Sequence, residues 1–480
     1  MLKRIIAIAC TLVMIIALVG CGSTKREIVY LTLSSSDSEA ILAAAGITLP
    51  SVEEADGAGT VVKWFAWYDA FNNYSEDEIV NTGYYTFTQK YGSSIEWIET
   101  TYFERFDDLA NLILSSQSPD MYPAGVNSTA VFPTRCIKGT FVPVDDYIDY
   151  TDPLWAGMAD AADYFVLGGE HYAIVTDLTY SNVVSYNRRV MEEWGFDDPA
   201  ELYYNNEWTW DVFYEMCMEF SDGDEDRYAL DGYAYQGGII ESTGQQILQI
   251  SDGVFYSNID SPEIERAQNL IYDLVKNGCT YHEGTNYWAL REKGGANFGA
   301  GIADGLCLFY IIAPSFFTMP VEEITPLWGD VSEGEVMFCP LPRDDDGDGE
   351  YHLLSLPEGY VLVTGGTNHA GAVLLASCER FKIIDPTVIN IDQKQLKEIY
   401  LWTDEMLEMD DICYEIASRN PIMDLTGDLS DGLNNALNSV SNGITRTNSP
   451  STWAQLKETY RDQIEYYIDE LNATIDSYNS

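Results

Sequence analysis

The sequence predicts an α/β fold divided into two domains or lobes, and two observations lead to that prediction. The chain has 480 residues, 46% of them hydrophobic, which is a globular composition and a length that favours two folded units over one. From residue 61 onward, short apolar segments alternate with segments of helical periodicity. Such alternation is typical of parallel sheets covered by helices.

The first part of this alternation is regular. The pattern predicts an apolar strand over residues 61–67, a helix over 79–91, a strand over 94–99 and a helix over 103–115. A short third strand is expected at residues 120–122, before a loop that contains Pro and Gly.

Later elements have recognisable boundaries as well. Gly168-Gly169 joins two apolar segments, so a hairpin is expected there. Helices are predicted to begin at Thr209 and at Pro262, the second ending at Asn277-Gly278. The last helix, over residues 452–475, places its apolar side chains on one stripe, which we expect to face a core.

The N-terminus has the features of a secretory signal. Lys3 and Arg4 precede an apolar run that is shorter than the ~20 residues needed to span a bilayer. The run ends in Leu18-Val19-Gly20-Cys21, which resembles the lipobox of bacterial lipoproteins. That resemblance implies a lipoprotein signal peptide over residues 1–20 and acylation of Cys21. The alternative is a plain signal-peptide cut or an ordinary membrane anchor.

This reading places the protein outside the cytoplasm, attached to the cell membrane by lipid. Residues 21–59 are rich in Ser, Gly, Glu and Asp, and are predicted to be a flexible spacer between the lipid and the folded body, within which Ser38 to Gly46 could form a short helix.

Charge and cysteine content limit the possible partners. The formal net charge is −52, which disfavours nucleic acid and anionic lipid headgroups, so membrane attachment should depend on the acyl chains alone. An acidic surface that only keeps the protein soluble also accounts for this charge. Beyond Cys21 the chain has seven cysteines, an odd number without C-x-x-C spacing, which we expect to be small buried hydrophobic residues.

The sequence contains a weak candidate for a metal site. Asp344, Asp346, Asp348 and Gly349 match the first half of a calcium loop, but the twelfth position is Ser355 where Glu would supply a bidentate ligand. Because Asp and Gly are also ordinary turn formers, a solvated turn is the favoured interpretation and no metal is expected. The chain has no nucleophile elbow, phosphate loop or H-E-x-x-H motif, so we expect neither catalytic residues nor a cofactor.

Eight segments follow one another in a characteristic order: Tyr172 to Tyr180, Val183 to Arg188, Met191 to Gly195, Glu207 to Asp211, Asn297 to Ala303, Val336 to Pro342, Glu358 to Val363 and Gly443 to Leu471. This ordered set resembles the extracellular solute-binding proteins of ABC transporters, and the carbohydrate-binding branch fits best. Arg188 stands where the family has lysine. The resemblance covers about residues 61–471.

The resemblance implies a two-lobed, periplasmic-binding-protein-like fold. Each lobe would be a mostly parallel sheet flanked by helices, and hinge strands would join the lobes around a ligand cleft. The implied N-terminal lobe is 60–178 plus 337–390, and the C-terminal lobe is 184–333 plus 391–480. The implied partners are a small carbohydrate and the transmembrane permease subunits of an ABC transporter. A monomer is expected.

The family places ligand contacts in loops after the sheet strands and in the hinge. Carried over by position, the ligand-binding residues implied by the resemblance are Trp67, Tyr68, Asp69, Asn127, Tyr180 and Tyr310. Each of them is alternatively a core or rim residue without contact to ligand.

Composition agrees with a sugar as cargo. Aromatic residues form 13% of the chain, and aromatic rings stack on the apolar faces of sugars. Lys and Arg are scarce, which favours a neutral sugar over an anionic solute. A peptide or another solute in the same fold stays open. The alternative functions are a surface glycan hydrolase and an acidic surface adhesion or interaction protein.

Overall fold

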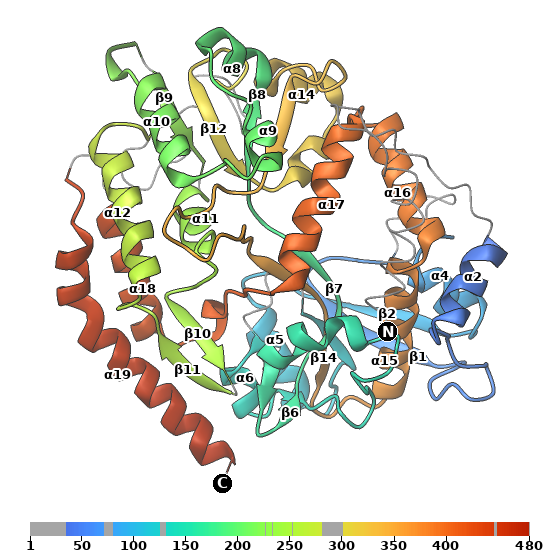
Figure 1. The fold of residues 1–480 in the computed structure, drawn as a ribbon. Helices are drawn as coiled ribbons and strands as arrows, with labels where there is room; N and C mark the ends of the chain where they lie inside the picture. Colours follow the sequence, from blue (N-terminus) through green and yellow to red (C-terminus); the bar gives the residue numbers. More distant parts are fainter. Residues whose placement is uncertain are drawn as a thin grey trace. The chain divides into compact units, whose positions relative to one another are not determined.

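The computed structural model describes residues 35–71, 80–124, 131–225, 227–232, 234–251, 253–280, 301–445 and 449–479. Its described residues form two compact units. Unit 1 holds the residues up to Leu178 and Pro357–Lys394, and unit 2 holds Thr179–Leu356 and Gln395–Tyr478. The predicted α/β class is confirmed, because each unit contains a sheet with helices packed against it (Figure 1). The expectation of a mostly parallel sheet in each lobe is wrong for unit 2, where β8 (Val183–Asn187) is antiparallel to both of its neighbours.

Unit 1 is built on a mixed sheet. Its strand order is β2 (Ser94–Glu99), β1 (Val61–Ala66), β3 (Met121–Pro123), β14 (Ser355–Val363) and β4 (Phe141–Val142), and β7 (Ile174–Tyr180) also pairs with β14. The strands β1, β2 and β3 run parallel, and Ala66 lies opposite Glu99. The apolar strand β1 is buried through most of its length, as expected for a strand covered on both faces.

The main helices of unit 1 near this sheet are α4 (Gly83–Gln89), α5 (Arg105–Leu114) and α15 (His369–Ile383). Helix α15 contacts both α4 and β1. Gly83 makes the approach of α4 to α15 possible, because a Cβ at this position would lie 2.3 Å from the backbone nitrogen of Glu379. The shorter elements of unit 1 are α6 (Thr134–Ile137), α7 (Ala159–Ala162), β5 (Val166–Leu167) and β6 (Glu170–His171). Strands β5 and β6 are the hairpin predicted at Gly168-Gly169.

The start of the described chain corrects one expectation. Residues 35–59 were predicted to belong to a flexible spacer, but they are folded into unit 1. Helix α2 (Ser35–Ala44) places Leu42 in the same hydrophobic cluster as Ile47, Trp64 and Leu375. The burial of Leu42 and Ile47 holds this segment on the unit. The signal peptide and Cys21 lie outside the described residues.

Unit 2 has its own sheet, in the order β13 (Val336–Cys339), β8 (Val183–Asn187), β12 (Cys307–Ile312) and β9 (Tyr228–Asp231). Strand β8 is antiparallel to β12 and β13, whereas β9 is parallel to β12. Every residue of β8, β12 and β13 is buried, which explains their continuous apolar sequences.

Helices and one hairpin complete unit 2 (Figure 1). The helices are α8 (Arg188–Trp194), α9 (Pro199–Tyr204), α10 (Trp210–Phe220), α11 (Tyr235–Glu241), α12 (Pro262–Lys276), α14 (Val321–Trp328), α17 (Asp404–Arg419), α18 (Asp431–Ile444) and α19 (Trp453–Asn479). The hairpin is β10 (Leu248–Ser251) with β11 (Val254–Ser257), and α16 (Pro386–Glu398) contains the Lys394/Gln395 boundary between the units. The predicted starts of α10 and α12 agree with the structure to within one residue.

The unit boundaries differ from the predicted lobes at two places. Residues 337–390 were assigned to the first lobe, but residues 337–356 lie in unit 2, because β13 pairs with β8 and so completes the unit 2 sheet. Residues 391–394 were assigned to the second lobe, but they lie in unit 1.

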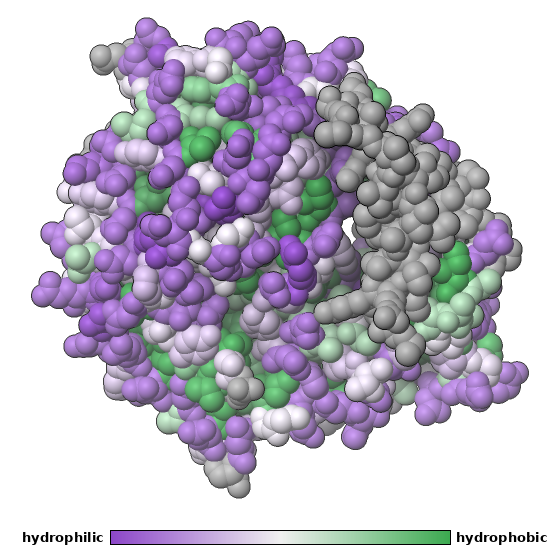
Figure 2. All heavy atoms as spheres, viewed as in Figure 1, coloured by the Kyte–Doolittle hydropathy of each residue, from purple (hydrophilic) through white to green (hydrophobic). Residues whose placement is uncertain are grey.

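Three further observations concern the surface, the cysteines and the helices. Figure 2 shows hydrophilic side chains over most of the face in view. The seven cysteines from Cys136 to Cys413 are free and buried. Among the described residues, no helix combines the length and the apolar character that crossing a membrane requires.

Candidate ligand-binding site

The carboxyl ends of β1, β2 and β3 lie at one edge of the unit 1 sheet, because these strands are parallel. In open α/β sheets, ligands bind outside the carboxyl ends of the strands. Trp67 and Tyr68 follow β1 directly, and Tyr102 and Phe103 follow β2. Tyr122 lies within β3. We call these five residues the unit 1 aromatic cluster.

Ring contacts hold this cluster together. The centroid of the Trp67 ring lies 5.2 Å from Tyr68, 5.4 Å from Tyr102 and 6.2 Å from Tyr122. The rings of Tyr102 and Phe103 are 5.6 Å apart. Tyr68, Tyr102 and Phe103 are 42%, 38% and 91% exposed, whereas Tyr122 is buried. The cluster therefore presents aromatic surface to solvent at the edge where a ligand is expected.

Hydrogen bonds from neighbouring residues position the first loop of the cluster. The Trp97 indole nitrogen donates to the Ala66 carbonyl oxygen at 3.0 Å, and the Trp64 indole nitrogen donates to the Tyr68 carbonyl oxygen at 3.4 Å. The Asp69 carboxylate accepts the backbone N–H of Phe71 at 3.1 Å and so forms a local turn. The structure thus brings Trp67 and Tyr68 together, and Asp69 shapes the same loop.

Arg105, the first residue of α5, lies among these rings. Its guanidinium carbon is 3.8 Å from the Tyr102 ring centroid, 4.6 Å from Phe106 and 5.4 Å from Trp67. These are cation–π distances. Neither Tyr102 nor Arg105 was selected from the sequence, although both follow the predicted strand over residues 94–99. Asn127, which was selected, lies outside the described residues.

Tyr180 lies in unit 2, where its hydroxyl donates a hydrogen bond to the carboxylate of Asp410 on α17. Burial, followed by the nearby charge of Asp410, raises the pKa of Tyr180 well above its usual value. Burial likewise raises the pKa of Asp410. Within this unit, the Tyr180 hydroxyl is therefore bonded to another side chain of the protein.

Tyr310 lies inside the unit 2 sheet and is only 2% exposed. It stands opposite Ser185 on β8 and Asp231 on β9, and its ring centroid is 5.6 Å from that of Trp328. In unit 2 this ring is therefore a core aromatic.

Two buried carboxyl groups lie at the corresponding edge of the unit 2 sheet. Asp231 ends β9 and Asn182 precedes β8, which runs in the opposite direction, so both residues lie at the same edge. The Asn182 amide donates to Glu241 at 3.3 Å. Burial raises the pKa values of Asp231 and Glu241 to about 7. These polar groups were missed, because only the strand order shows that they share an edge.

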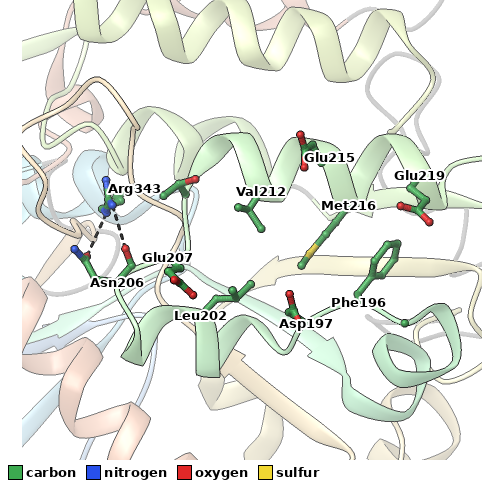
Figure 3. A pocket seen from close by; sticks show the side chains of 12 residues that line it. Phe196, Asp197, Leu202, Asn206, Glu207, Val212, Glu215, Met216, Glu219 and Arg343 are labelled. Atoms are coloured by element: carbon green, nitrogen blue, oxygen red, sulfur yellow. Dashed lines mark hydrogen bonds between the residues drawn. The ribbon is translucent and has the colours of Figure 1, made fainter.

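A cavity of about 610 Å³ lies elsewhere in unit 2, between α9 and α10 (Figure 3). Leu202, Val212 and Met216 supply apolar lining, and the carboxylates of Asp197, Glu207, Glu215 and Glu219 lie around it. Arg343 borders the cavity and donates from Nη2 to the Asn206 carbonyl oxygen at 3.1 Å. None of the predicted ligand-binding residues lines this cavity.

The carboxylates of the candidate calcium loop accept hydrogen bonds from protein donors. Asp344 is 5% exposed and accepts a hydrogen bond from Arg266 Nε at 2.8 Å. A second Asp344 oxygen accepts the backbone N–H of Asp346, and Asp348 accepts that of Glu350. Among the described residues, no group of three or more His, Cys, Asp or Glu side chains is arranged to hold a metal ion. These contacts favour the turn interpretation.

The comparison with protein families matches residues 84–304 to the family model of bacterial extracellular solute-binding proteins. This match confirms the resemblance stated from the sequence, and it includes Tyr102, Arg105 and Tyr122. The comparison with curated protein sequences finds no match.

Solved structures share the two-lobed fold. An ABC substrate-binding protein of Listeria monocytogenes, in complex with cycloalternan, is 13% identical with a TM-score of 0.58 over 85% of this chain and 99% of that chain. An extracellular solute-binding protein of Staphylococcus aureus, in complex with maltose, is 10% identical with a TM-score of 0.60 over 86% and 98%. A cyclic alpha-maltosyl-1,6-maltose binding protein of Arthrobacter globiformis is 13% identical with a TM-score of 0.58 over 87% and 99%. The family and these neighbours are binding proteins rather than enzymes.

Proposed function

We propose that this chain, which matches the bacterial extracellular solute-binding family over residues 84–304, captures a sugar or oligosaccharide outside the cytoplasm. The ligand is delivered to an ABC permease, and acylated Cys21 holds the receptor at the membrane. The observation that carries the proposal is the unit 1 aromatic cluster at the carboxyl ends of parallel strands.

The chemistry of the cluster supports a sugar ligand. Sugar rings have apolar C–H faces that pack on aromatic rings, and their hydroxyls bond to polar side chains. Trp67 and Tyr102 are held nearly perpendicular, at 85°, so the pair forms a corner and not a flat plane. Three structural neighbours are themselves described as binding cyclic or linear sugars, which agrees with this choice. The enclosure of the ligand between two lobes stays a prediction.

A thermal-shift screen of the mature chain against a panel of neutral and acidic oligosaccharides tests the proposal. A ligand present at 100 times its dissociation constant adds about 2.7 kcal/mol to the free energy of unfolding, so a true ligand raises the melting temperature. A panel containing linear, branched and cyclic sugars that gives no shift would contradict a sugar-binding function. Release of reducing ends from a polysaccharide would favour a hydrolase instead.

A further inference from the structure

Arg105 is a buried cation for which the structure records no carboxylate partner among the described residues. It is 9% exposed, and its Nε has no hydrogen-bond partner. One of its other nitrogens, Nη1, donates to the carbonyl oxygen of Tyr102. The guanidinium also hydrogen-bonds the Tyr122 hydroxyl. A guanidinium has five N–H donors, so these two contacts leave part of its donor capacity unused, including Nε.

Several other arginines of the chain lie beside carboxylates. The guanidiniums of Arg188, Arg227, Arg266 and Arg461 each lie against at least one carboxylate. The chain has 77 acidic and 25 basic residues, so a carboxylate is the ordinary neighbour of an arginine in this protein. Burial of a charged group without a counter-charge is costly. Among the described residues, Arg105 is therefore a buried guanidinium without the carboxylate that its charge would ordinarily attract.

The acidic residues of the same segment have other partners. The Asp108 carboxylate accepts the hydroxyl of Thr100 at 2.7 Å, and the Glu104 carboxylate accepts the hydroxyl of Thr101 at 3.2 Å. Asp107 is exposed on the first turn of α5. None of the three forms a recorded ion pair with Arg105.

A second guanidinium lies close to the first. The guanidinium carbon of Arg135 is 3.5 Å from the Phe106 ring centroid, and Phe106 is also in contact with Arg105. Burial raises the pKa of the Tyr122 hydroxyl, and the positive charges of both arginines oppose that rise, which shows that both lie near this hydroxyl. The two cations thus adjoin the aromatic cluster at the edge where the ligand is expected.

We propose that the sugar bound at the unit 1 aromatic cluster carries a negative charge, a carboxylate or a sulfate, that pairs with the guanidinium of Arg105. A planar carboxylate, or two oxygens of a tetrahedral sulfate, can accept two parallel N–H bonds from a guanidinium. The inference rests on the proposed sugar-binding function and makes it more specific. It replaces the neutral cargo expected from composition, because the local cations matter more to a ligand than the average charge of the chain.

Matched pairs of ligands test this inference by calorimetric titration of the mature chain. One arm compares oligogalacturonides with their methyl esters, which have the same rings without the charge. The other arm compares sulfated oligosaccharides with their desulfated forms. We expect at least one acidic member to bind ten-fold or more tightly than its neutral partner, with an affinity that falls as salt is raised. The arm that gives this preference identifies the anionic group.

Variants of Arg105 test whether this residue causes the preference for the charged ligand. Arg105→Gln should abolish the preference for the charged ligand, whereas Arg189→Gln, which removes an exposed guanidinium paired with Glu193, should leave it unchanged. Arg105→Lys keeps the charge without the planar donor pair and should retain part of the preference. If Arg105→Gln does not fold, the salt dependence of ligand binding by the unmodified chain still tests whether the ligand's charge contributes to affinity. Arg105→Lys then tests the part played by the guanidinium.

The outcomes separate this inference from the function on which it rests. Equal or tighter binding of the neutral members overturns the anionic ligand and leaves sugar binding intact. A preference for the acidic members that survives Arg105→Gln in a folded variant also overturns the role of Arg105. Absence of binding by every sugar overturns the proposed function and this inference together.

Discussion

The rings of Trp67 and Tyr102 lie 5.4 Å apart at an angle of 85°, although the two residues are separated by 35 positions in the chain. The parallel pairing of β1 with β2, with Ala66 opposite Glu99, brings the loops after both strands together. Arg105 then lies against both rings. The strand register therefore determines the geometry of the candidate site.

The close contact of α4 with α15 predicts that replacing Gly83 by alanine lowers the stability of the protein. In Gly83→Ala the new Cβ would lie 2.3 Å from the Glu379 backbone nitrogen, so the helices must separate and the core beneath them loosens. We expect a loss of about 1–3 kcal/mol in the free energy of unfolding, measured by denaturant titration. The matched control is Gly223→Ala, where the nearest atom is the Tyr228 hydroxyl at 4.0 Å. Equal stability of the two variants would contradict this packing.

The buried carboxyl of Asp231 predicts a pH-dependent stability. Burial raises its pKa from 3.8 to about 7, so between these values the folded state holds a proton that the unfolded state has lost. The free energy of unfolding should therefore decrease as pH rises from about 4 to 7, by on the order of 2–4 kcal/mol for this group.

Asp231→Asn removes this contribution. Relative to the unmodified chain, the variant should be more stable at pH 8 than at pH 5, as measured by denaturant unfolding at both pH values. Asp348→Asn, a substitution at an exposed carboxylate, is the control. Parallel pH profiles for Asp231→Asn and the unmodified chain would show that Asp231 is ionised in the folded protein.

The resemblance of Leu18-Val19-Gly20-Cys21 to a lipobox predicts how the protein is attached. Cys21→Ala should release the protein from the membrane fraction into the medium, because a net charge of −52 disfavours binding to anionic lipid. Immunoblots of fractionated cells expressing each form measure this. Full retention of the Cys21→Ala protein in the membrane fraction would indicate another mode of attachment.

We expect that the turn at residues 344–349 does not bind calcium, so calcium should not change the stability of the protein. Because Asp344 already accepts the N–H groups of Arg266 and Asp346, added Ca²⁺ at 1 mM should not change the melting temperature, nor should a chelator. A rise of several degrees with calcium, lost in Asp348→Asn, would instead establish a metal site in this loop.

Much of the fold could be predicted from local sequence. The apolar segments at β1 and β2, the Gly168-Gly169 turn and the Pro262 helix start are each determined by residues close together in the chain. Leu42 and Ile47 were missed because the short apolar segment over residues 40–49 does not itself reveal what it contacts. Their burial depends on α15 and the β1 sheet, which come from distant segments.

The candidate site could be predicted only in part. Trp67 and Tyr68 were selected because they follow an obvious strand. Tyr102 and Arg105 follow the next strand, but their role depends on the β1–β2 register. The burial of Tyr310 follows from its place in the apolar sequence Cys307–Ile312, between two other strands. Local sequence does not give that strand order.

Calorimetric titration of Trp67→Ala with the oligosaccharide that gives the largest thermal shift tests the central claim most directly. Loss of the indole removes the ring that contacts Tyr68, Tyr102 and Arg105, so the dissociation constant should rise at least ten-fold. Tyr256→Ala, which removes a 40% exposed ring from unit 2, should bind as the unmodified chain does. Unchanged affinity in a folded Trp67→Ala protein would contradict a sugar site at the unit 1 aromatic cluster.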